Sequence, residues 1–447
     1  MTQRKYFGTD GVRGLANTFP MTPDVALRLG AAAGRYFRQD KKQHRVVIGK
    51  DTRRSSYMFE NALTAGFTST GMDVYLLGPV PTPAIGVLTR SMRADVGVMI
   101  SASHNSYQDN GIKFFGPDGF KLDDGAELKI EEFLQGEIDY AKAENIGMAR
   151  RIDDGLGRYM EFAKSAFPRK KLLDGMKVVV DCANGAAYKA APIVLWELGA
   201  EVISLGVNPD GFNINLDCGS THPDAAARAV LEHGADVGIC LDGDADRVIL
   251  IDEKGQVADG DQLMGLIATQ WAARGTLAQN TLVATVMSNM GLERHLDDQG
   301  ITLKRTNVGD RYVVQEMRSG GYNLGGEQSG HIVMSDYATT GDGLMAGLQF
   351  LNAMVESNMP ASQLLQVFEP MPQMLENVSF TIGATPLENS NVLQAIADGE
   401  AELGAKGRLL IRKSGTEPLV RVMGECEDEA LLKTVVMNIA DTVRSVA

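Results

Sequence analysis

The sequence predicts an α/β protein of several domains, and three observations lead to this fold class. Short apolar runs bounded by Gly, Asp and Asn alternate with amphipathic segments of helix length, which is typical of buried, largely parallel strands joined by helices. With 447 residues, the chain is longer than one hydrophobic core usually supports. Three strand openings resemble one another, so we expect a repeated α/β unit.

Each of these openings is an apolar strand that ends in a small polar loop before a helix. The strands are predicted at residues 45–48, 177–180 and 282–286. Their loops have the sequences Gly-Lys-Asp-Thr-Arg, Asp-Cys-Ala-Asn-Gly and Met-Ser-Asn-Met-Gly. Because open α/β sheets bind ligands at such strand ends, a threefold repeat around a ligand cleft is the expected architecture.

Charged or turn-rich segments divide the chain further. We expect four domains, at residues 1–153, 154–253, 254–368 and 369–447. The last of them has strand patterns near residues 376–382, 407–412 and 419–425 and a helical pattern from about Asp428. This segment therefore predicts a small α+β domain.

Charge and cysteine content argue against several classes of protein. The formal net charge is −14, from 57 acidic and 43 basic residues, whereas nucleic-acid and anionic-membrane partners need a basic face. The four cysteines show no metal-binding spacing, so we expect reduced thiols of a cytoplasmic protein. No stretch approaches the roughly eighteen apolar residues of a membrane span, and residues 1–14 lack the apolar core of a signal peptide.

The strongest local signal is Asp-Gly-Asp-Ala-Asp-Arg at residues 242–247, between the predicted strands 237–241 and 248–251. In an extended or gently turning chain alternate side chains point the same way, so Asp242, Asp244 and Asp246 can converge on one hard cation. Without a cation, three carboxylates between buried strands would repel one another. The motif therefore predicts a metal site.

Two other interpretations of this motif stay open. A calcium-binding EF-hand loop would need Gly where Arg247 stands and a helix before it, whereas this motif lies between strands. A phosphatase of the haloacid-dehalogenase type also has Asp-x-Asp after a strand and would use Asp242 as its nucleophile. Such a phosphatase would keep its activity without a nucleophilic serine, including Ser103 of the loop described next.

The second signal is Ser-Ala-Ser-His-Asn-Ser at residues 101–106, after the predicted strand 96–100. A serine on a loop at a strand end is exposed enough to accept and return a phosphoryl group, and His104 can orient Ser103. Ser-rich loops are more often structural, so this motif alone does not identify a nucleophile. Lys113, in the next predicted strand, is interpreted either as an acid/base group or as a surface lysine.

Two further loops carry groups that suit a sugar phosphate. Gly-Gly-Glu-Gln-Ser-Gly-His at residues 325–331 places a carboxylate, an amide, a hydroxyl and an imidazole within five residues of a glycine-rich loop, which suits the hydroxyls of a sugar ring. Arg-Lys-Ser-Gly-Thr-Glu-Pro at residues 412–418, with Arg421 nearby, offers cations, hydroxyls and backbone N–H groups to a phosphate. Taken alone, the first could be a polar turn and the second any sulfate-binding turn.

Together and in this order, the four motifs resemble those of the α-D-phosphohexomutase superfamily over essentially the whole chain. The resemblance implies three related α/β domains with mixed sheets and a C-terminal α+β domain similar to the TATA-binding protein, around a central cleft. The sequences at residues 6–14, 209–215, 218–222 and 327–329 resemble its glucosamine-phosphate branch. The glucose and mannose branch typically has Met where this chain has Gln328.

The resemblance implies an isomerase that interconverts glucosamine 6-phosphate and glucosamine 1-phosphate, on the route to UDP-N-acetylglucosamine, through a phosphoserine and a 1,6-bisphosphate. A phosphomannomutase or phosphoglucomutase of the same superfamily is the closest alternative, and a sugar-phosphate-binding regulator is a more distant one. We expect one Mg²⁺ per active site, glucosamine or glucose 1,6-bisphosphate as activator, and neither a nucleic-acid nor a membrane partner. A homodimer is one assembly to consider.

The same resemblance implies a role for each site residue. Ser103 would carry the phosphoryl group, and its phosphate would join the three aspartates around Mg²⁺. That phosphate would be contacted by Arg247 and Arg13. Proton transfer would fall to His104, Lys113 or His331. Glu327 and Ser329 would hold the sugar hydroxyls. The substrate's own phosphate would be held by Arg412, Ser414, Gly415, Thr416 and Arg421.

One position departs from the superfamily pattern, which usually has Pro where this chain has Ser106. Without Pro a fixed φ is lost, and the serine loop is less preorganised. The change also adds a hydroxyl, so Ser101 and Ser106 stay as rivals to Ser103 for phosphorylation.

Overall fold

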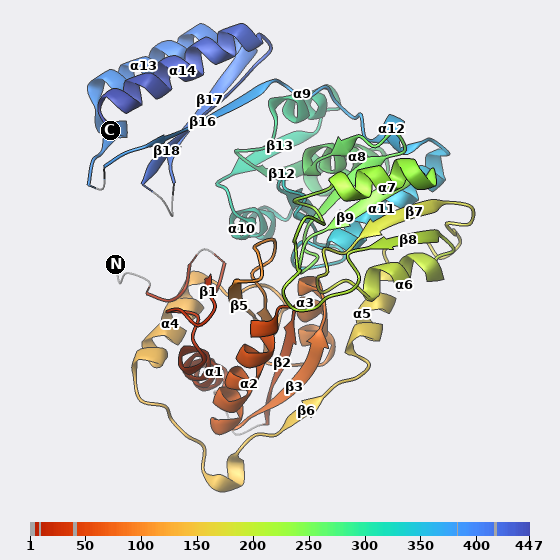
Figure 1. Ribbon diagram of the computed structural model, residues 1–447, viewed down its shortest axis with the longest axis vertical. Helices are drawn as coiled ribbons and strands as arrows, with labels where there is room; N and C mark the ends of the chain where they lie inside the picture. Colours follow the sequence, from red (N-terminus) through yellow and green to blue (C-terminus); the bar gives the residue numbers. More distant parts are fainter. Residues whose placement is uncertain (1–4, 9, 39–42, 382, 415–417) are drawn as a thin grey trace. The chain divides into compact units, whose positions relative to one another are not determined.

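The structure is a computed structural model of the chain and describes residues 5–8, 10–38, 43–381, 383–414 and 418–447. The chain folds into two compact units (Figure 1). One comprises Met1–Thr285 and Lys304–Val367, and the other comprises Val286–Leu303 and Phe368–Ala447.

The first sheet of the larger unit has six strands in the order β1-β5-β4-β2-β3-β6. β2, β3, β4 and β6 form parallel pairs, whereas β5 pairs antiparallel with both β1 and β4. Its strands are β1 (Val12–Leu15), β2 (His44–Lys50), β3 (Met72–Pro79), β4 (Val96–Ile100), β5 (Asp109–Phe115) and β6 (Ala149–Arg151). Its helices are α1 (Pro23–Phe37), α2 (Arg54–Ser69), α3 (Thr82–Ser91) and α4 (Asp124–Gln135).

The second sheet has five strands in the order β11-β10-β9-β7-β8. β7 pairs parallel with β8 and β9, and β10 pairs antiparallel with β9 and β11. Its strands are β7 (Lys177–Asp181), β8 (Glu201–Leu205), β9 (Val237–Leu241), β10 (Val248–Asp252) and β11 (Val257–Ala258). The helices of this segment are α5 (Gly155–Lys164), α6 (Ala190–Glu197) and α7 (Asp224–His233).

The third sheet has four strands in the order β13-β12-β14-β15, with β12 and β14 parallel and β14 and β15 antiparallel. Its strands are β12 (Thr281–Thr285), β13 (Thr302–Thr306), β14 (Leu324–Gly326) and β15 (Ile332–Met334). The helices of the larger unit in this segment are α8 (Gly260–Ala273), α10 (Asp310–Gly320), α11 (Gly343–Ser357) and α12 (Ala361–Leu364).

All three sheets are mixed, as the resemblance implied, and not largely parallel as the apolar runs alone suggested. In each of them an antiparallel pair of strands brackets one of the polar motifs: β4 and β5 the serine loop, β9 and β10 the aspartate loop, and β14 and β15 the Glu-Gln-Ser loop. The strands β4, β9, β10, β14 and β15 are buried throughout, which explains their apolar sequences.

The smaller unit is an α+β fold, as predicted. Its antiparallel sheet has the order β16-β18-β17, and α13 and α14 lie side by side against it (Figure 1). The elements are β16 (Gln373–Ser379), β17 (Gly407–Lys413), β18 (Leu419–Cys426), α13 (Ser390–Leu403), α14 (Glu429–Ser445) and α9 (Met290–Asp298). β16 begins and ends three residues earlier than predicted, and Asp428 is the N-cap of α14.

None of the helices in the described part of the chain is both long enough and apolar enough to cross a bilayer. The longest apolar helix of the larger unit, α11, is instead a core helix, because every residue from Gly343 to Met354 is buried.

Asp342 caps the N-terminus of α11 inside this core. Its Oδ1 accepts hydrogen bonds from the Met345 N–H and from the Tyr159 hydroxyl, each at 3.0 Å. Burial raises the pKa of this carboxyl from 3.8 to about 6, although the helix N–H groups and Tyr159 lower it. Ionisation of Asp342 therefore destabilises the fold as the pH rises through this range, by about 3 kcal/mol.

We predict that the stability of Asp342→Asn relative to the unmodified protein increases as the pH rises from 4 to 7, because Asn keeps the helix cap without ionising. Thermal unfolding followed by circular dichroism should show a difference in Tm that grows by a few degrees over this range. Parallel pH profiles of the two proteins would contradict the assignment.

Candidate active site

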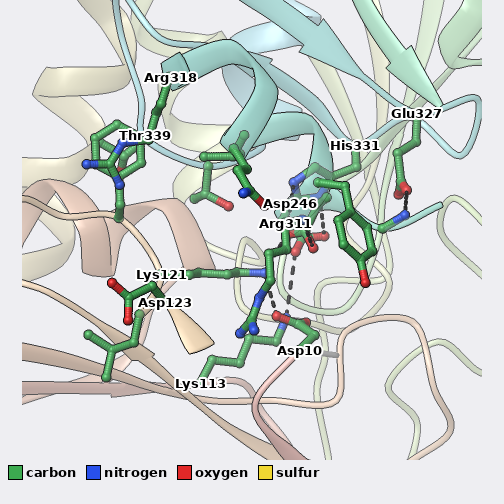
Figure 2. Close-up of a pocket in the computed structure, with 18 of the residues that line it drawn as sticks. Asp10, Lys113, Lys121, Asp123, Asp246, Arg311, Arg318, Glu327, His331 and Thr339 are labelled. Carbon is green, nitrogen blue, oxygen red and sulfur yellow. Dashed lines mark hydrogen bonds and ion pairs between the residues drawn. The ribbon is translucent and has the colours of Figure 1, made fainter. Parts of the chain in front are cut away.

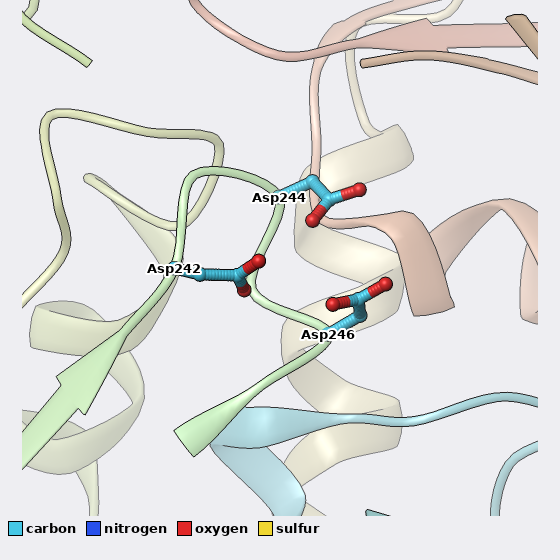
Figure 3. Close-up of side chains that lie close together, drawn as sticks. All are labelled: Asp242, Asp244 and Asp246. Carbon is cyan, nitrogen blue, oxygen red and sulfur yellow. The ribbon is translucent and has the colours of Figure 1, made fainter. Parts of the chain in front are cut away.

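The three aspartates predicted to bind a metal converge in the loop between β9 and β10. Each offers a carboxylate oxygen within 4.8 Å of those of the other two, and all three side chains are buried (Figure 3). The loop is a tight turn in which Ala245 has φ +58°, so it bends more sharply than the extended or gently turning chain that the sequence suggested. The turn, and not strand alternation, therefore brings the carboxylates together.

These carboxylates fit a divalent cation. Asp244 Oδ1 and Asp246 Oδ1 are buried and accept no hydrogen bond from the described residues. Burial, together with Asp246 and Asp244, raises the pKa of Asp242 well above its ordinary value. Since buried carboxylates are normally hydrogen-bonded, paired or bound to a metal, this oxygen-rich cluster could hold an ion such as Mg²⁺.

Ser103, in the loop between β4 and β5, lies directly against this cluster. Its hydroxyl donates a hydrogen bond to Asp242 Oδ2 at 2.6 Å, and its Oγ lies 3.4 Å from His104 Nδ1. The side chain is only 4% exposed, so Ser103 is less accessible than the sequence suggested, although it lines a pocket. Of its rivals, Ser106 is exposed, and Ser101 Oγ accepts the Ser103 N–H at 2.9 Å.

Lys113 on β5 places a positive charge beside the aspartates. Its Nζ lies 3.1 Å from Asp10 Oδ2, 3.2 Å from Asp244 Oδ2 and 3.7 Å from Asp246 Oδ2. Burial lowers the pKa of Lys113, but these carboxylates outweigh burial and raise the pKa well above its ordinary value. The side chain is 2% exposed, so the interpretation as a surface lysine was wrong.

Two arginines and a neutral histidine complete this part of the site. The Arg247 N–H donates to Asp242 Oδ1 at 3.1 Å, and an Arg13 guanidinium N–H donates to the Ala102 carbonyl. The Nε atoms of both arginines are buried and make no hydrogen bond to the described residues, although Arg247 Nε lies 4.0 Å from Asp246 Oδ1. Burial, together with Arg247 and Arg13, lowers the pKa of His104 to about 4, so the imidazole is neutral at pH 7.

The loop between β14 and β15 contributes Glu327 and His331. Glu327 Oε1 accepts the Gly309 N–H at 3.0 Å, and the Ser329 hydroxyl donates to Glu327 Oε2 at 3.4 Å. His331 is buried, with Nδ1 3.5 Å from Asp246 Oδ1 (Figure 2). Gln328, the residue that differs between the branches, donates to Asp259 Oδ2 at 3.0 Å and so supports the N-cap of α8.

The site contains a cavity of about 910 Å³, which several of the predicted site residues line. It is large enough for a hexose bisphosphate, since ligand pockets typically measure about 300–1,000 Å³. The predicted site residues that line it are Arg13, Ser103, Lys113, Asp246, Arg247, Glu327 and His331.

Other residues of this cavity carry no motif and were missed. Lys121 Nζ bonds Asp10 Oδ1 at 2.6 Å (Figure 2) and Asp310 Oδ2 at 2.5 Å. Arg311, which also lines the cavity, pairs with Glu127 at 2.6 Å. These ion pairs join residues far apart in the sequence, so no local pattern indicates them. Asp10 alone lay inside a segment that the resemblance had singled out, residues 6–14.

The predicted phosphate-binding residues lie in the smaller unit. Arg412 on β17 and Arg421 on β18 are cross-strand partners, and Arg421 Nε is buried and donates no hydrogen bond to the described residues. Burial and Arg421 lower the pKa of Arg412. Like charges opposite each other on a sheet are unfavourable, which is consistent with a site for an anion. Ser414 lies at the end of β17, and Gly415 and Thr416 lie outside the described residues.

The sequence matches models of all four domains of one family. These are phosphoglucomutase/phosphomannomutase alpha/beta/alpha domains I (residues 4–141), II (157–255) and III (259–371) and the C-terminal domain (375–442). Curated relatives include a phosphoglucosamine mutase from Dinoroseobacter shibae, 70% identical over 99% of both chains. Another, from Paracoccus denitrificans, is 68% identical over 99% of this chain and 100% of the relative.

Solved structures share the fold at lower sequence identity. A phosphoglucomutase/phosphomannomutase family protein from Burkholderia thailandensis has a TM-score of 0.83 and 24% identity, covering 98% of this chain and 97% of its own. An N-acetylphosphoglucosamine mutase from Aspergillus fumigatus, solved with GlcNAc-6P and magnesium, has a TM-score of 0.68 and 18% identity, with coverages of 99% and 96%.

We predict that Asp244→Asn weakens binding of Mg²⁺ or Mn²⁺ by at least about tenfold, because a cation-attracting carboxylate is lost from the cluster. Isothermal titration calorimetry measures the affinity. A matched control is Asp236→Asn, at the opposite, exposed end of β9. Equal affinities of the two variants would contradict a metal site at this loop.

Proposed function

We propose that this chain, which belongs to the phosphoglucosamine mutase family of the α-D-phosphohexomutase superfamily, interconverts glucosamine 6-phosphate and glucosamine 1-phosphate through a phosphorylated Ser103. As a member of this family, the chain is an isomerase. The reaction supplies glucosamine 1-phosphate for UDP-N-acetylglucosamine synthesis. The proposal includes the four-domain division at residues 1–153, 154–253, 254–368 and 369–447.

The observation that carries the proposal is the 2.6 Å hydrogen bond between the Ser103 hydroxyl and Asp242. It places a nucleophilic oxygen at a carboxylate cluster that fits a cation, and on the wall of a cavity large enough for the substrate. A serine in this position can accept a phosphoryl group and return it. The two other serines of the loop lack such a bond to the aspartates.

The reaction then consists of two transfers. O1 of glucosamine 6-phosphate attacks the phosphorus of phosphorylated Ser103, the bond from phosphorus to Oγ breaks, and the O1 proton ends on Oγ. The product of this step is a 1,6-bisphosphate. After the bisphosphate turns around, Ser103 Oγ attacks the phosphorus of the 6-phosphate, the bond from phosphorus to O6 breaks, and the Oγ proton ends on O6. Glucosamine 1-phosphate then leaves, and Ser103 is phosphorylated again. Added glucosamine or glucose 1,6-bisphosphate would serve to load the serine.

The chain's own charges neutralise the transferred group. We propose that Asp242, Asp244, Asp246 and the phosphate on Ser103 would hold one Mg²⁺, which would supply positive charge to the phosphoryl oxygens. The unsatisfied oxygens of the cluster support this assignment. The buried Nε groups of Arg247 and Arg13 are donors that can turn to the same phosphate.

Three side chains are candidates to move protons, and their environments separate them. His104 is neutral and lies 3.4 Å from Ser103 Oγ, so it can accept a proton there. Lys113 has a raised pKa, which suits a cation that neutralises charge and makes it the weakest of the three as a proton donor. Burial lowers the pKa of His331, but Asp246 and Asp310 outweigh burial and raise it.

The remaining predicted residues would bind the sugar phosphate. Glu327 and Ser329 offer a carboxylate and a hydroxyl to the sugar ring, beside the cavity that Glu327 lines. Arg412 and Arg421 offer two guanidinium groups on neighbouring strands to the phosphate that does not react. Ser414, Gly415 and Thr416 belong to the same proposed set. A cytoplasmic location and a homodimer stay predictions.

The test of this function is a coupled assay with glucosamine 6-phosphate, Mg²⁺ and a catalytic amount of a 1,6-bisphosphate. We predict turnover by the unmodified protein and a loss of at least about 10³-fold in kcat for Ser103→Ala, because the phosphoryl carrier is removed. Ser106→Ala, in the exposed part of the same loop, should keep its activity. A phosphatase that uses Asp242 would instead release phosphate without Ser103.

The same assay separates the branches of the superfamily. We expect kcat/KM to be highest for glucosamine 6-phosphate among the 6-phosphates of glucosamine, glucose and mannose. A higher value for glucose 6-phosphate or mannose 6-phosphate would favour the phosphoglucomutase or phosphomannomutase alternative.

We predict that Arg421→Ala raises KM by about 10- to 100-fold, because a charge-assisted bond to the substrate's phosphate is lost. The variant should fold normally, since it also removes a like-charge pair. Lys433→Ala, exposed on α14 and outside the phosphate-binding motif, is the control. Steady-state kinetics would contradict this role if the two variants had the same KM as the unmodified protein.

A further inference from the structure

Two side chains hold the backbone of the serine loop from outside the loop. The Ser103 carbonyl accepts hydrogen bonds from Arg53 Nη2 at 3.0 Å and from Asn215 Nδ2 at 2.9 Å. The Asn105 carbonyl accepts from the same two nitrogens, at 2.5 Å and 2.9 Å. Two carbonyls on either side of His104 are therefore each bonded twice, by the same pair of residues.

Arg53 comes from the loop that follows β2, in the same sheet as the serine loop. Its side chain is completely buried and is paired with Asp51, which also accepts the Arg53 N–H at 2.9 Å and the Ser56 hydroxyl at 2.8 Å. Burying a guanidinium is unfavourable unless its donors are satisfied. The serine-loop carbonyls satisfy Nη2, so the arginine and the loop depend on each other.

Asn215 comes from the second sheet's segment, beyond β8. It has φ +58°, a region in which Asn is more common than most residues, and its N–H donates to the Ala183 carbonyl at 2.9 Å. Asp181 fixes this part of the chain through the Ala183 and Gly219 N–H groups, at 2.9 Å and 2.8 Å. The side-chain amide of Asn215 is thus aimed at the serine loop by its own backbone.

The aspartate loop packs against the same contact. A Cβ placed on Gly243, between Asp242 and Asp244, would lie 2.7 Å from the Ser103 carbonyl oxygen and 2.8 Å from Asn215 Nδ2. The serine loop, the aspartate loop and the Asn215 segment therefore meet with no room for another atom. A shift of the Ser103 carbonyl would move Ser103 Oγ relative to Asp242.

Ser103 needs such support. Ser103 has φ +51°, which is unfavourable for a residue with a Cβ. In addition, Ser106 stands at a position where a proline would restrict the backbone conformation of the loop. External hydrogen bonds can maintain a strained backbone that the loop's own sequence does not favour.

We propose that Arg53 and Asn215 are positioning residues, which hold the Ser103 loop so that Oγ stays at the aspartate cluster. The inference rests on the proposed role of Ser103 as the phosphoryl carrier. It also gives a function to two of the repeated strand openings: Gly-Lys-Asp-Thr-Arg supplies Arg53, and Asp-Cys-Ala-Asn-Gly supplies the carbonyl that orients Asn215.

Asn215→Asp tests the proposal with little change in shape. Asp tolerates a positive φ but cannot donate the two hydrogen bonds when ionised. We expect kcat to fall by about 10- to 100-fold, as misplacement of a reacting group predicts, while KM for glucosamine 6-phosphate stays within about threefold. Asn213→Asp, which alters a local turn bond of the same segment, should leave both constants unchanged.

Arg53→Lys is the second variant, because Lys can pair with Asp51 but lacks the fork that reaches two carbonyls. It should show the same fall in kcat with a nearly constant KM. Tm is measured for every variant, and kcat is compared at a temperature at which each is folded. If the residues were only structural, Tm would fall while kcat per folded enzyme stayed at the level of the unmodified protein, and this result would overturn the inference. An unmodified protein without mutase activity would instead count against the proposed function.

Discussion

Asp242, Asp244 and Asp246 are buried, and their carboxylates lie within 4.8 Å of one another, so their negative charges repel each other. The larger unit offsets this repulsion by placing positive and hydrogen-bond donor groups around the three carboxylates. Positive or donor groups reach the aspartates from each of the three sheets: Lys113 and Ser103 from the first, the Arg247 N–H from the second and His331 from the third. Two carboxylate oxygens nevertheless stay unsatisfied within the described residues. A bound cation and a phosphate would complete the balance of charge.

The mixed sheets explain how these groups meet. Each of the three motifs lies between two antiparallel strands of a sheet that also contains parallel pairs. The sequence suggested the loops after the parallel strands as ligand sites. Two of them instead contribute hydrogen bonds that position the serine loop: the loop after β2 contains Arg53, and the loop after β7 contains the Ala183 carbonyl. A chain of net charge −14 can in this way present local cations to an anionic substrate.

Local patterns were enough to predict the aspartate cluster, the serine loop and the α+β character of the smaller unit, since each depends on residues adjacent in the sequence. The order of the motifs predicted the mixed sheets, through the resemblance. Lys113 was left undecided, because strand alternation does not tell which side of a strand meets acids from other loops. Lys121, Arg53 and Asn215 were missed, because their partners lie far away in the sequence.

The account depends most directly on a phosphate stored on Ser103 beside the aspartates. The decisive measurement is incubation of the protein with a 1,6-bisphosphate carrying labelled phosphate, followed by peptide mapping. The account predicts label on Ser103, removed when excess unlabelled glucosamine 6-phosphate is added. Isomerisation that proceeds while Ser103 never carries label, or label confined to Ser101 or Ser106, would contradict it.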